Sequence, residues 1–568
     1  MTSGPFSFWG RTAPQFVILN EVKNLSGIFS KNQERFFGPT RLRMTKSELC
    51  GPETNVPLRQ EAVMPSEKNP AVATNTSAKS NLVQRRDFLS GAATLAGASL
   101  VGGAGSSLLE GSALAAEPTP VPEPAPPSMT PAVERKLARW QDQRWLLDAV
   151  IAALGPEWDQ GRLGGLQSIP GGAADAAGLR ARIHKFNDMT REFTRAAVKR
   201  EREARQYEKD GRTIPARETY FLAAHLYAGA QWSIFENTPD NLLLNDKKNE
   251  CYAKYIQFAD HEIRRVEVPF GGSGKALPGY LHLPPNHSGR VPCIWSISGL
   301  DSNKEGGAAI YGDGLRERGI ATLALEGPGQ NECAIRGIHL TQTNWQDAGR
   351  VVLEWLRAQK EIDPDRIALR GASLGSYLGT QVASIDDRLK GAALQAMAVE
   401  PTMHTAFETA SPSFKLRFLY YTGLESEAEL DKFLESWTLH GVAEKVKCPY
   451  LLVGGEDDQL SPVEYGLQLM DLLTCPKQIL LYEGALHSVS GAPSTTNGPS
   501  TGTFIAEWFS DRFAGKPMQS KLLKVDAGGQ VHDFKFEDSR KALSVSLLWQ
   551  GGDRSAMSPE KPTQVQEP

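Results

Sequence analysis

The chain has 568 residues, enough for two or three domains and for a large buried core. Its 62 basic and 66 acidic residues are mixed along the sequence and give a formal net charge of -4, so a nucleic acid partner is not expected. The six cysteines form no C-x-x-C pair and have no histidine at zinc-ligand spacing. The composition therefore excludes a small disulfide-stapled scaffold and predicts no metal site.

An export signal is indicated within residues 64–115. Arg85 and Arg86 precede Asp87 and a weakly apolar run that carries no charge between Asp87 and Glu110. Small residues suited to a signal peptidase end at Ala115, where we expect cleavage. The run contains too much glycine and alanine for a good membrane span. This order resembles a twin-arginine signal peptide. It predicts the twin-arginine export machinery as a partner and a periplasmic or extracellular mature protein.

The segments on either side of this signal are not expected to fold. An export signal normally begins a protein, so Met64 is the expected start and residues 1–63 form a non-native or disordered extension. Residues 116–131 are rich in proline, a composition that favours extended chain and cannot bury a core. We expect this stretch to be a linker.

Two patterns of apolar residues follow in chain order. Between residues 132 and 262 they recur at helical spacing, which predicts a helical domain of five or six helices. From residue 263 short apolar runs alternate with amphipathic stretches, which indicates a mostly parallel sheet covered by helices on both faces. The eight expected strands are 264–268, 279–283, 293–297, 321–325, 367–369, 391–395, 450–453 and 478–481.

The second domain is expected to span residues 263–518. Extra helical stretches interrupt its pattern between residues 399 and 447, so this segment is a candidate lid over the strand ends. Residues 519–568 are expected to be a C-terminal extension.

A nucleophile is predicted at Ser373. The run Gly371-Ala372-Ser373-Leu374-Gly375 lies between an expected strand and an expected helix, which is the setting of a nucleophile elbow. Glycine on both sides lets the turn become sharp enough to hold a strained serine with an exposed hydroxyl. The five-residue pattern is common by chance, so its position between a strand and a helix carries the interpretation.

A serine hydroxyl needs a base that takes its proton and a carboxylate that orients the base. His487 lies on a loop after the last expected strand and is the predicted base. Asp458, three residues past Gly455, is the predicted acid after the preceding strand. Its neighbours Asp457 and Glu456 are alternatives. The order serine, acid, histidine matches the order that this strand arrangement requires.

An acyl-transfer intermediate carries negative charge on oxygen, which two aligned backbone N–H groups must meet. Leu374, just after the nucleophile, is expected to supply one of them. The loop after strand 293–297 is expected to supply the other, with Leu300 as the candidate. The sequence therefore predicts an oxyanion hole formed by Leu300 and Leu374.

Together these motifs resemble the FrsA-like branch of α/β-hydrolases, which includes 2,6-dihydropseudooxynicotine hydrolase. The resemblance covers about residues 212–518, and its marks are SGLDSNKEG (298–306), EGPGQNE (326–332), GASLG (371–375), GEDDQLSP (455–462) and GALH (484–487). It implies an α/β-hydrolase fold, with a mostly parallel eight-stranded sheet, an N-terminal helical domain and a helical lid. It also implies a Ser-Asp-His triad without a cofactor, and a helical domain that helps to close the active site and to form a homodimer.

The resemblance leaves the reaction open, because members of this branch include esterases and a hydrolase that cleaves a carbon–carbon bond. That C–C hydrolase has an additional acidic residue, for which Glu408 is the nearest match here. The export signal and the dissimilar lid, 399–447, are departures from that relative. Fold and triad therefore carry over better than substrate does.

Three functions are considered for a small-molecule substrate. The first is hydrolysis of a carboxylic ester or related acyl substrate through an acyl-enzyme. The second is cleavage of a C–C bond of diketone type, or of an amide, by the same triad. The third is binding without catalysis on a hydrolase scaffold, which is disfavoured because all three triad residues are present.

The export signal gives a direct test. Replacing Arg85 and Arg86 together with lysine should stop export, because the export receptor reads the guanidinium pair and not charge alone. The fraction of protein in the periplasm and medium, measured by immunoblot, checks this expectation. Unchanged export of the double variant would contradict the targeting prediction.

Overall fold

The computed structural model describes residues 131–159 and 162–536. The expected extension 1–63, the expected signal peptide 64–115 and all but the last residue of the expected linker 116–131 lie outside the described residues. The same holds for residues 537–568 of the expected C-terminal extension.

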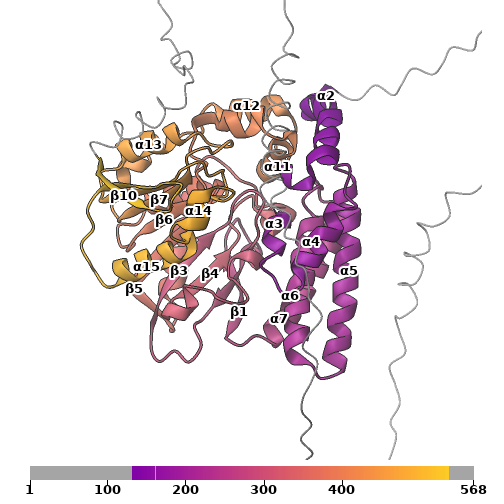
Figure 1. Cartoon of the computed structure of the whole chain (residues 1–568), viewed down its shortest axis with the longest axis horizontal. Helices are drawn as coiled ribbons and strands as arrows, with labels where there is room; N and C mark the ends of the chain where they lie inside the picture. The colour runs from indigo at the N-terminus through magenta and orange to yellow at the C-terminus, as the bar shows by residue number, and fades with distance from the viewer. Residues whose placement is uncertain (1–130, 160–161, 537–568) are drawn as a thin grey trace, which may run out of the picture. The chain divides into compact units, whose positions relative to one another are not determined.

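Six α-helices lie within the stretch that we expected to be helical (purple to magenta in Figure 1). Thr238 is the N-cap of the last of these helices: its side chain accepts a hydrogen bond from the Asn241 N–H, and Pro239 follows as the first helical residue. Most of the fifth helix, α6, is buried, since it packs between α5 and α7. The helices are α2 (Pro131–Leu154), α3 (Arg162–Leu166), α4 (Gly172–Arg180), α5 (Asp188–Lys209), α6 (Thr213–Ala230) and α7 (Pro239–Gln257).

The rest of the described chain is built on one sheet with the order β1-β2-β4-β3-β5-β6-β7-β8-β9-β10. The strands from β4 to β9 in this order pair in parallel, and β2 and β10 run antiparallel to their neighbours. This confirms the expected mostly parallel sheet. The strands are β1 (Ile263–Pro269), β2 (Ala276–His282), β3 (Val291–Ile297), β4 (Ala321–Leu325), β5 (Ile362–Ala372), β6 (Ala392–Gln395), β7 (Tyr450–Gly455), β8 (Lys477–Tyr482), β9 (Lys521–Val525) and β10 (Val531–Lys535).

The expected number of eight strands is wrong, because ten strands are present in the described part of the chain. The two additional strands, β9 and β10, lie in the stretch 519–568 that we treated as an extension. β9 pairs in parallel with β8, and its Leu522 and Val525 are fully buried. β9 has two lysines among its five residues, which interrupt the apolar pattern of a strand. β10 is mostly exposed and has no such pattern, so the sequence predicted neither strand.

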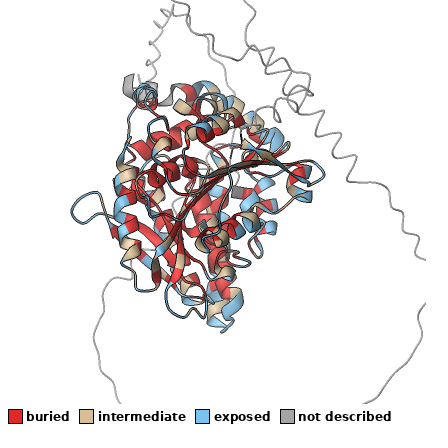
Figure 2. Ribbon diagram, turned by 90° about the vertical axis from the view of Figure 1, so that its left-hand side faces the viewer, coloured by how far each residue is buried: buried red, intermediate tan, exposed pale blue. Residues whose placement is uncertain are grey.

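Helices cover both faces of the sheet. On one face, α9 (Asn344–Arg357) and α10 (Leu374–Ala383) pack Trp345, Val352 and Tyr377 into the larger core. On the other face, α15 (Thr501–Phe513) packs Trp508 and Phe509 into a smaller core. Figure 2 shows the buried residues concentrated in the sheet and on the helix surfaces turned toward it. The strands therefore lie between two packed layers of helices.

The candidate lid, residues 399–447, is helical and packs against the N-terminal helices. A buried acid makes this connection: Asp159 accepts hydrogen bonds from Trp232 Nε1 and from the hydroxyls of Ser411 and Ser413. Arg417 of the insert donates to the Gln231 carbonyl at 2.8 Å. The helical elements of the insert are η4 (Pro401–Met403), η5 (Thr405–Thr409), α11 (Pro412–Thr422), α12 (Glu427–Leu434) and η6 (Ala443–Lys445).

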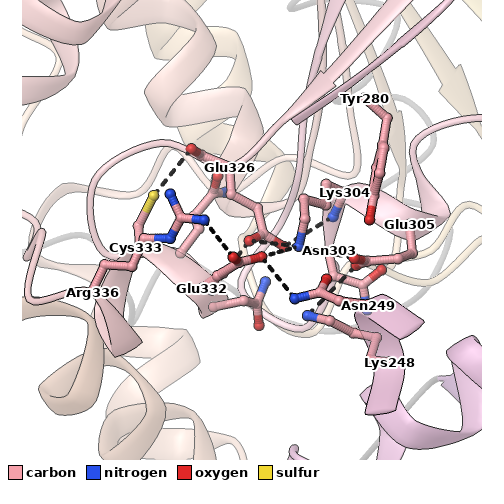
Figure 3. A network of polar contacts seen from close by, with 12 residues as sticks. Lys248, Asn249, Tyr280, Asn303, Lys304, Glu305, Glu326, Glu332, Cys333 and Arg336 are labelled. Carbon is pink, nitrogen blue, oxygen red and sulfur yellow. Dashed lines mark hydrogen bonds and ion pairs between the residues drawn. The ribbon is translucent and has the colours of Figure 1, made fainter. Parts of the chain in front are cut away.

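A second set of buried charges joins α7 to the loops after β3 and β4 (Figure 3). Lys304 Nζ lies 2.8 Å from Glu305 Oε1, 2.7 Å from Glu332 Oε2 and 3.5 Å from Glu326 Oε2. Lys248 of α7 lies 3.6 Å from Glu305 on the other side. Burial alone would lower the pKa of Lys304, but the three carboxylates hold it well above its ordinary value. Lys304 is therefore a charged centre on which two loops and one helix converge.

Replacing Lys304 with methionine should lower the free energy of unfolding by about 3–5 kcal/mol, because buried carboxylates would lose their counter-charge. Chemical denaturation of the variant beside wild type measures this loss. Lys360→Met is the matched control, since that side chain is 88% exposed and lies 3.7 Å from Glu361. Equal stability of the two variants would show that the network does not hold these elements together.

Candidate active site

Ser373 lies at the junction of β5 and α10, as the elbow pattern predicts. Its backbone has φ 54° and ψ -126°, a conformation that costs a non-glycine residue of order 1–3 kcal/mol. The strain persists because β5 and α10 hold the residue on both sides, with the Ser373 N–H donating to the Gln395 carbonyl at 2.9 Å. The turn thus presents the serine side chain at the end of the central strand.

Three glycines make this turn possible because backbone lies against each of them. A Cβ atom on Gly371 would lie 2.2 Å from the Gly375 carbonyl oxygen, and one on Gly375 would lie 2.4 Å from the Ile297 carbonyl oxygen. A Cβ on Gly299 would lie 2.9 Å from the Ala372 carbonyl oxygen. No real Cβ approaches backbone this closely, so larger residues would push the elbow away from β3.

The structure brings Ser373, His487 and Asp458 together in one hydrogen-bonded chain. His487 Nε2 lies 2.9 Å from Ser373 Oγ. On its other side His487 Nδ1 lies 2.8 Å from Asp458 Oδ2 and 3.0 Å from Oδ1. The Asp458 side chain is fully buried and also accepts from the N–H groups of Leu460 and Ser461. These bonds fix the carboxylate and leave Nε2 facing the serine.

The two alternative acids point elsewhere. Glu456 forms an ion pair with Lys524 of β9 at 3.0 Å, and Asp457 is exposed. The Asp457 N–H donates to the Ala485 carbonyl at 3.0 Å, which ties the acid loop to the loop that carries His487. The turn therefore brings Asp458, the third residue after Gly455, to His487.

The backbone N–H groups of Leu300 and Leu374 have no acceptor in the part of the chain that the structure describes. Side chains hold the Leu300 loop from two directions. Tyr421 of α11 donates from its hydroxyl to the Leu300 carbonyl at 2.8 Å, and Gln330 Nε2 donates to the Ser298 carbonyl at 2.6 Å. With its carbonyls bound in this way, the loop keeps the Leu300 N–H available to a ligand.

The proposed additional acid, Glu408, is exposed and forms an ion pair with Lys415 at 2.5 Å. Sequence reasoning missed a second acid of the same insert, Glu400, which is buried and accepts from the N–H and hydroxyl of Thr405. Burial raises the pKa of Glu400 above its ordinary value. Its burial depends on the fold of the insert, which the sequence pattern did not indicate.

A cavity of about 680 Å³ lies beside the elbow. It is lined from the catalytic domain by Gly299 and Ala372 and from the helical domain by Phe221 and His225. Its volume is that of a site for a small organic molecule.

Within residues 131–159 and 162–536, no cluster of His, Cys, Asp or Glu side chains could hold a metal ion. The five cysteines of the same ranges are buried and form no disulfide bond. None of the helices described there is long and apolar enough to cross a membrane.

Comparison with known proteins shows which proteins this chain resembles. A family model described as esterase FrsA-like matches residues 184–465. Among solved structures, 2,6-dihydroxy-pseudo-oxynicotine hydrolase superposes with a TM-score of 0.51 at 20% identity, over 58% of this chain and 90% of that chain. The chain belongs to the α/β-hydrolase superfamily. This confirms the resemblance and the fold class expected from sequence.

Curated α/β-hydrolases are similar to part of the chain. The chain is 28% identical over 239 residues to the alpha/beta hydrolase xenA of Xenoacremonium sinensis, covering 40% of this chain and 56% of that protein. It is 27% identical over 287 residues to the alpha/beta hydrolase gkaG of Penicillium citrinum, covering 48% of this chain and 66% of that protein. The chain thus spans less than two thirds of the length of these two relatives.

Asp458→Asn should lower turnover of a short activated ester by about 10⁴-fold, because an amide would hold His487 in the wrong tautomer at nearly constant shape. Asp457→Asn is the matched control, since that side chain is exposed and has no contact with the histidine. Turnover and thermal midpoints of both variants check the expectation. An inactive Asp457→Asn beside a normal Asp458→Asn would place the acid one residue earlier.

Proposed function

We propose that this protein is a serine hydrolase that acts on a carboxylic ester or related acyl substrate through an acyl-enzyme. The observation that supports the proposal most directly is the continuous chain from Ser373 Oγ through His487 to Asp458, with contacts of 2.9 Å and 2.8 Å. A base within hydrogen-bond reach of a hydroxyl, and itself oriented by a carboxylate, is the arrangement that activates a serine.

In the proposed reaction His487 Nε2 takes the proton of Ser373 as the oxygen attacks the acyl carbon. The imidazolium then gives this proton to the leaving alkoxide, and the acyl-enzyme remains. A water molecule repeats the sequence: His487 takes its proton, the hydroxide attacks the acyl carbon, and Ser373 leaves with the proton returned by His487. Asp458 stays ionised throughout and stabilises the imidazolium.

Negative charge develops on the substrate oxygen in both tetrahedral intermediates. The N–H groups of Leu300 and Leu374 are the proposed donors, and Tyr421 and Gln330 hold the loop that carries Leu300. Donors that are fixed before the reaction begins cost no reorganisation when the charge appears.

The same triad could cleave a C–C bond or an amide, whose leaving group must be protonated as a carbanion or an amine. A neighbour in the fold comparison bears the name of a pseudo-oxynicotine hydrolase. The acid expected to accompany that chemistry, Glu408, is exposed and paired with Lys415, so we rank ester hydrolysis first. Binding without catalysis is least favoured because the hydrogen-bonded chain is complete.

We also propose that the mature protein, beginning near Ala116, acts after export by the twin-arginine route. The arginine pair, the uncharged run that follows it and the small residues up to Ala115 support this location.

Purified mature protein should hydrolyse short 4-nitrophenyl esters without added metal and with a chelator present. Ser373→Ala should lower kcat by at least about 10³-fold, because the nucleophile is lost while binding groups remain. Ser436→Ala is the matched control, since that serine is exposed and donates only to the Phe433 carbonyl. Full activity of Ser373→Ala, or activity that needs added zinc or calcium, would refute the proposed mechanism.

A further inference from the structure

One wall of the 680 Å³ cavity carries an arginine that the proposed mechanism does not use. Arg370 lies on β5, three residues before Ser373, and lines the cavity with Gly371 and Ala372. Successive side chains of a strand point to opposite faces, and Ala368 belongs to the smaller core under α15. Arg370 therefore leaves the sheet on this same face, at the edge where the core ends and the cavity begins.

Arg370 has no hydrogen-bond or ion-pair partner among the residues that the structure describes. Asp313 is near enough to interact electrostatically with Arg370. Its carboxylate already accepts hydrogen bonds from the N–H groups of Ala309, Leu315 and Arg316. Two buried arginines elsewhere do have partners: Arg217 lies 3.2 Å from Asp260, and Arg417 donates to the Gln231 carbonyl at 2.8 Å. Arg370 differs from these two arginines because it lines the cavity and its side chain has no acceptor among the described residues.

Arg370 is half-buried, so its guanidinium loses part of its hydration without gaining a protein partner. Burial lowers the pKa of Arg370, and the charge of Asp313 offsets this only in part. A guanidinium presents its N–H groups in a planar fork that matches a carboxylate with two parallel hydrogen bonds. A carboxylate ligand in the cavity would supply the hydrogen-bond acceptor that the described protein groups do not give Arg370.

The same cavity reaches the backbone on both sides of the nucleophile. Gly299 and Ala372 line it, and a Cβ on Gly299 would lie 3.6 Å from Ser373 Oγ. Ser373 is three positions after Arg370 in the sequence, a rise of about 10 Å in extended chain. A ligand anchored at Arg370 can therefore extend toward the serine over the length of a short carbon chain.

The acids Asp301, Asp313 and Glu317 line the cavity as well as Arg370, so its charge favours a singly charged carboxylate over a phosphate monoester. The other lining arginine, Arg318, is bound by Glu507 at 2.6 Å and by the Gly314 carbonyl. One free guanidinium balances one negative charge, whereas a phosphate monoester carries up to two near neutral pH.

We propose that Arg370 is a specificity residue that binds a carboxylate carried by the substrate, so that the preferred substrates are acyl esters with a free acid at the far end of the acyl chain. This inference rests on the proposed function, because it assigns the substrate class of the same site. It accounts for an unpaired arginine beside the elbow, which neither the triad nor the oxyanion loop requires.

The test compares 4-nitrophenyl esters of straight-chain dicarboxylic acids with neutral esters of equal chain length, from four to eight carbons. Wild type should prefer the acid ester at one of these lengths. In Arg370→Gln the ratio of kcat/KM for acid over neutral ester should fall by roughly 10- to 100-fold, the scale of hydrogen bonds to a charged group. Arg370→Lys should retain part of the preference, and Arg318→Gln should leave the ratio within about twofold of wild type.

A binding measurement separates failure of this inference from failure of the proposed function. Calorimetry with the Ser373→Ala protein should show that the free dicarboxylate of the preferred length binds, and that Arg370→Gln added to Ser373→Ala weakens this binding by a similar factor. This arm needs no catalysis. An equal response of acid and neutral esters to Arg370→Gln, or dicarboxylate binding that is unchanged by it, would overturn the carboxylate site. If Arg370→Gln does not fold, the ester preference and the dicarboxylate binding are measured with Arg370→Lys instead.

Discussion

The close contact of backbone with backbone around Ser373 is the constraint on which the site depends. Gly299, Gly371 and Gly375 have no room for a side chain, so the turn after β5 lies directly against the loop after β3. This contact puts the serine in a left-handed conformation and places its hydroxyl beside the loop that offers the Leu300 N–H. Nucleophile and oxyanion donor are thus positioned by one packing arrangement and not by two separate loops.

Elements distant in sequence hold this arrangement in place. Lys304 and its three carboxylates tie the loops after β3 and β4 to α7, while Asp159 ties the N-terminal helices to the insert. Tyr421 then links the insert to the Leu300 carbonyl. A buried charge is costly unless every partner is present, so these contacts favour one relative position of helical domain, insert and sheet. One of these elements, the loop after β3, also lines the cavity.

Local patterns were sufficient to predict much of the fold and the composition of the candidate site. The positions of eight strands followed from apolar runs, although β5 (Ile362–Ala372) is much longer than the expected 367–369. Ser373, Asp458 and His487 followed from turn motifs whose spacing the fold dictates. The features that were missed depend on long-range packing. β9 and β10 are stabilised by pairing with β8 and with each other and not by their own pattern. The isolation of Arg370 and the burial of Glu400 depend on which groups the folded chain brings near them.

The central claim is that Ser373 is a nucleophile activated by His487, and covalent trapping tests it most directly. A fluorophosphonate reacts with an activated serine by forming an oxygen–phosphorus bond and releasing fluoride. Intact-mass and peptide-mapping mass spectrometry should find one phosphonyl group per chain, on Ser373, with labelling abolished in Ser373→Ala and strongly slowed in His487→Ala. Labelling of a different residue, or equal labelling of folded and denatured protein, would contradict the assignment.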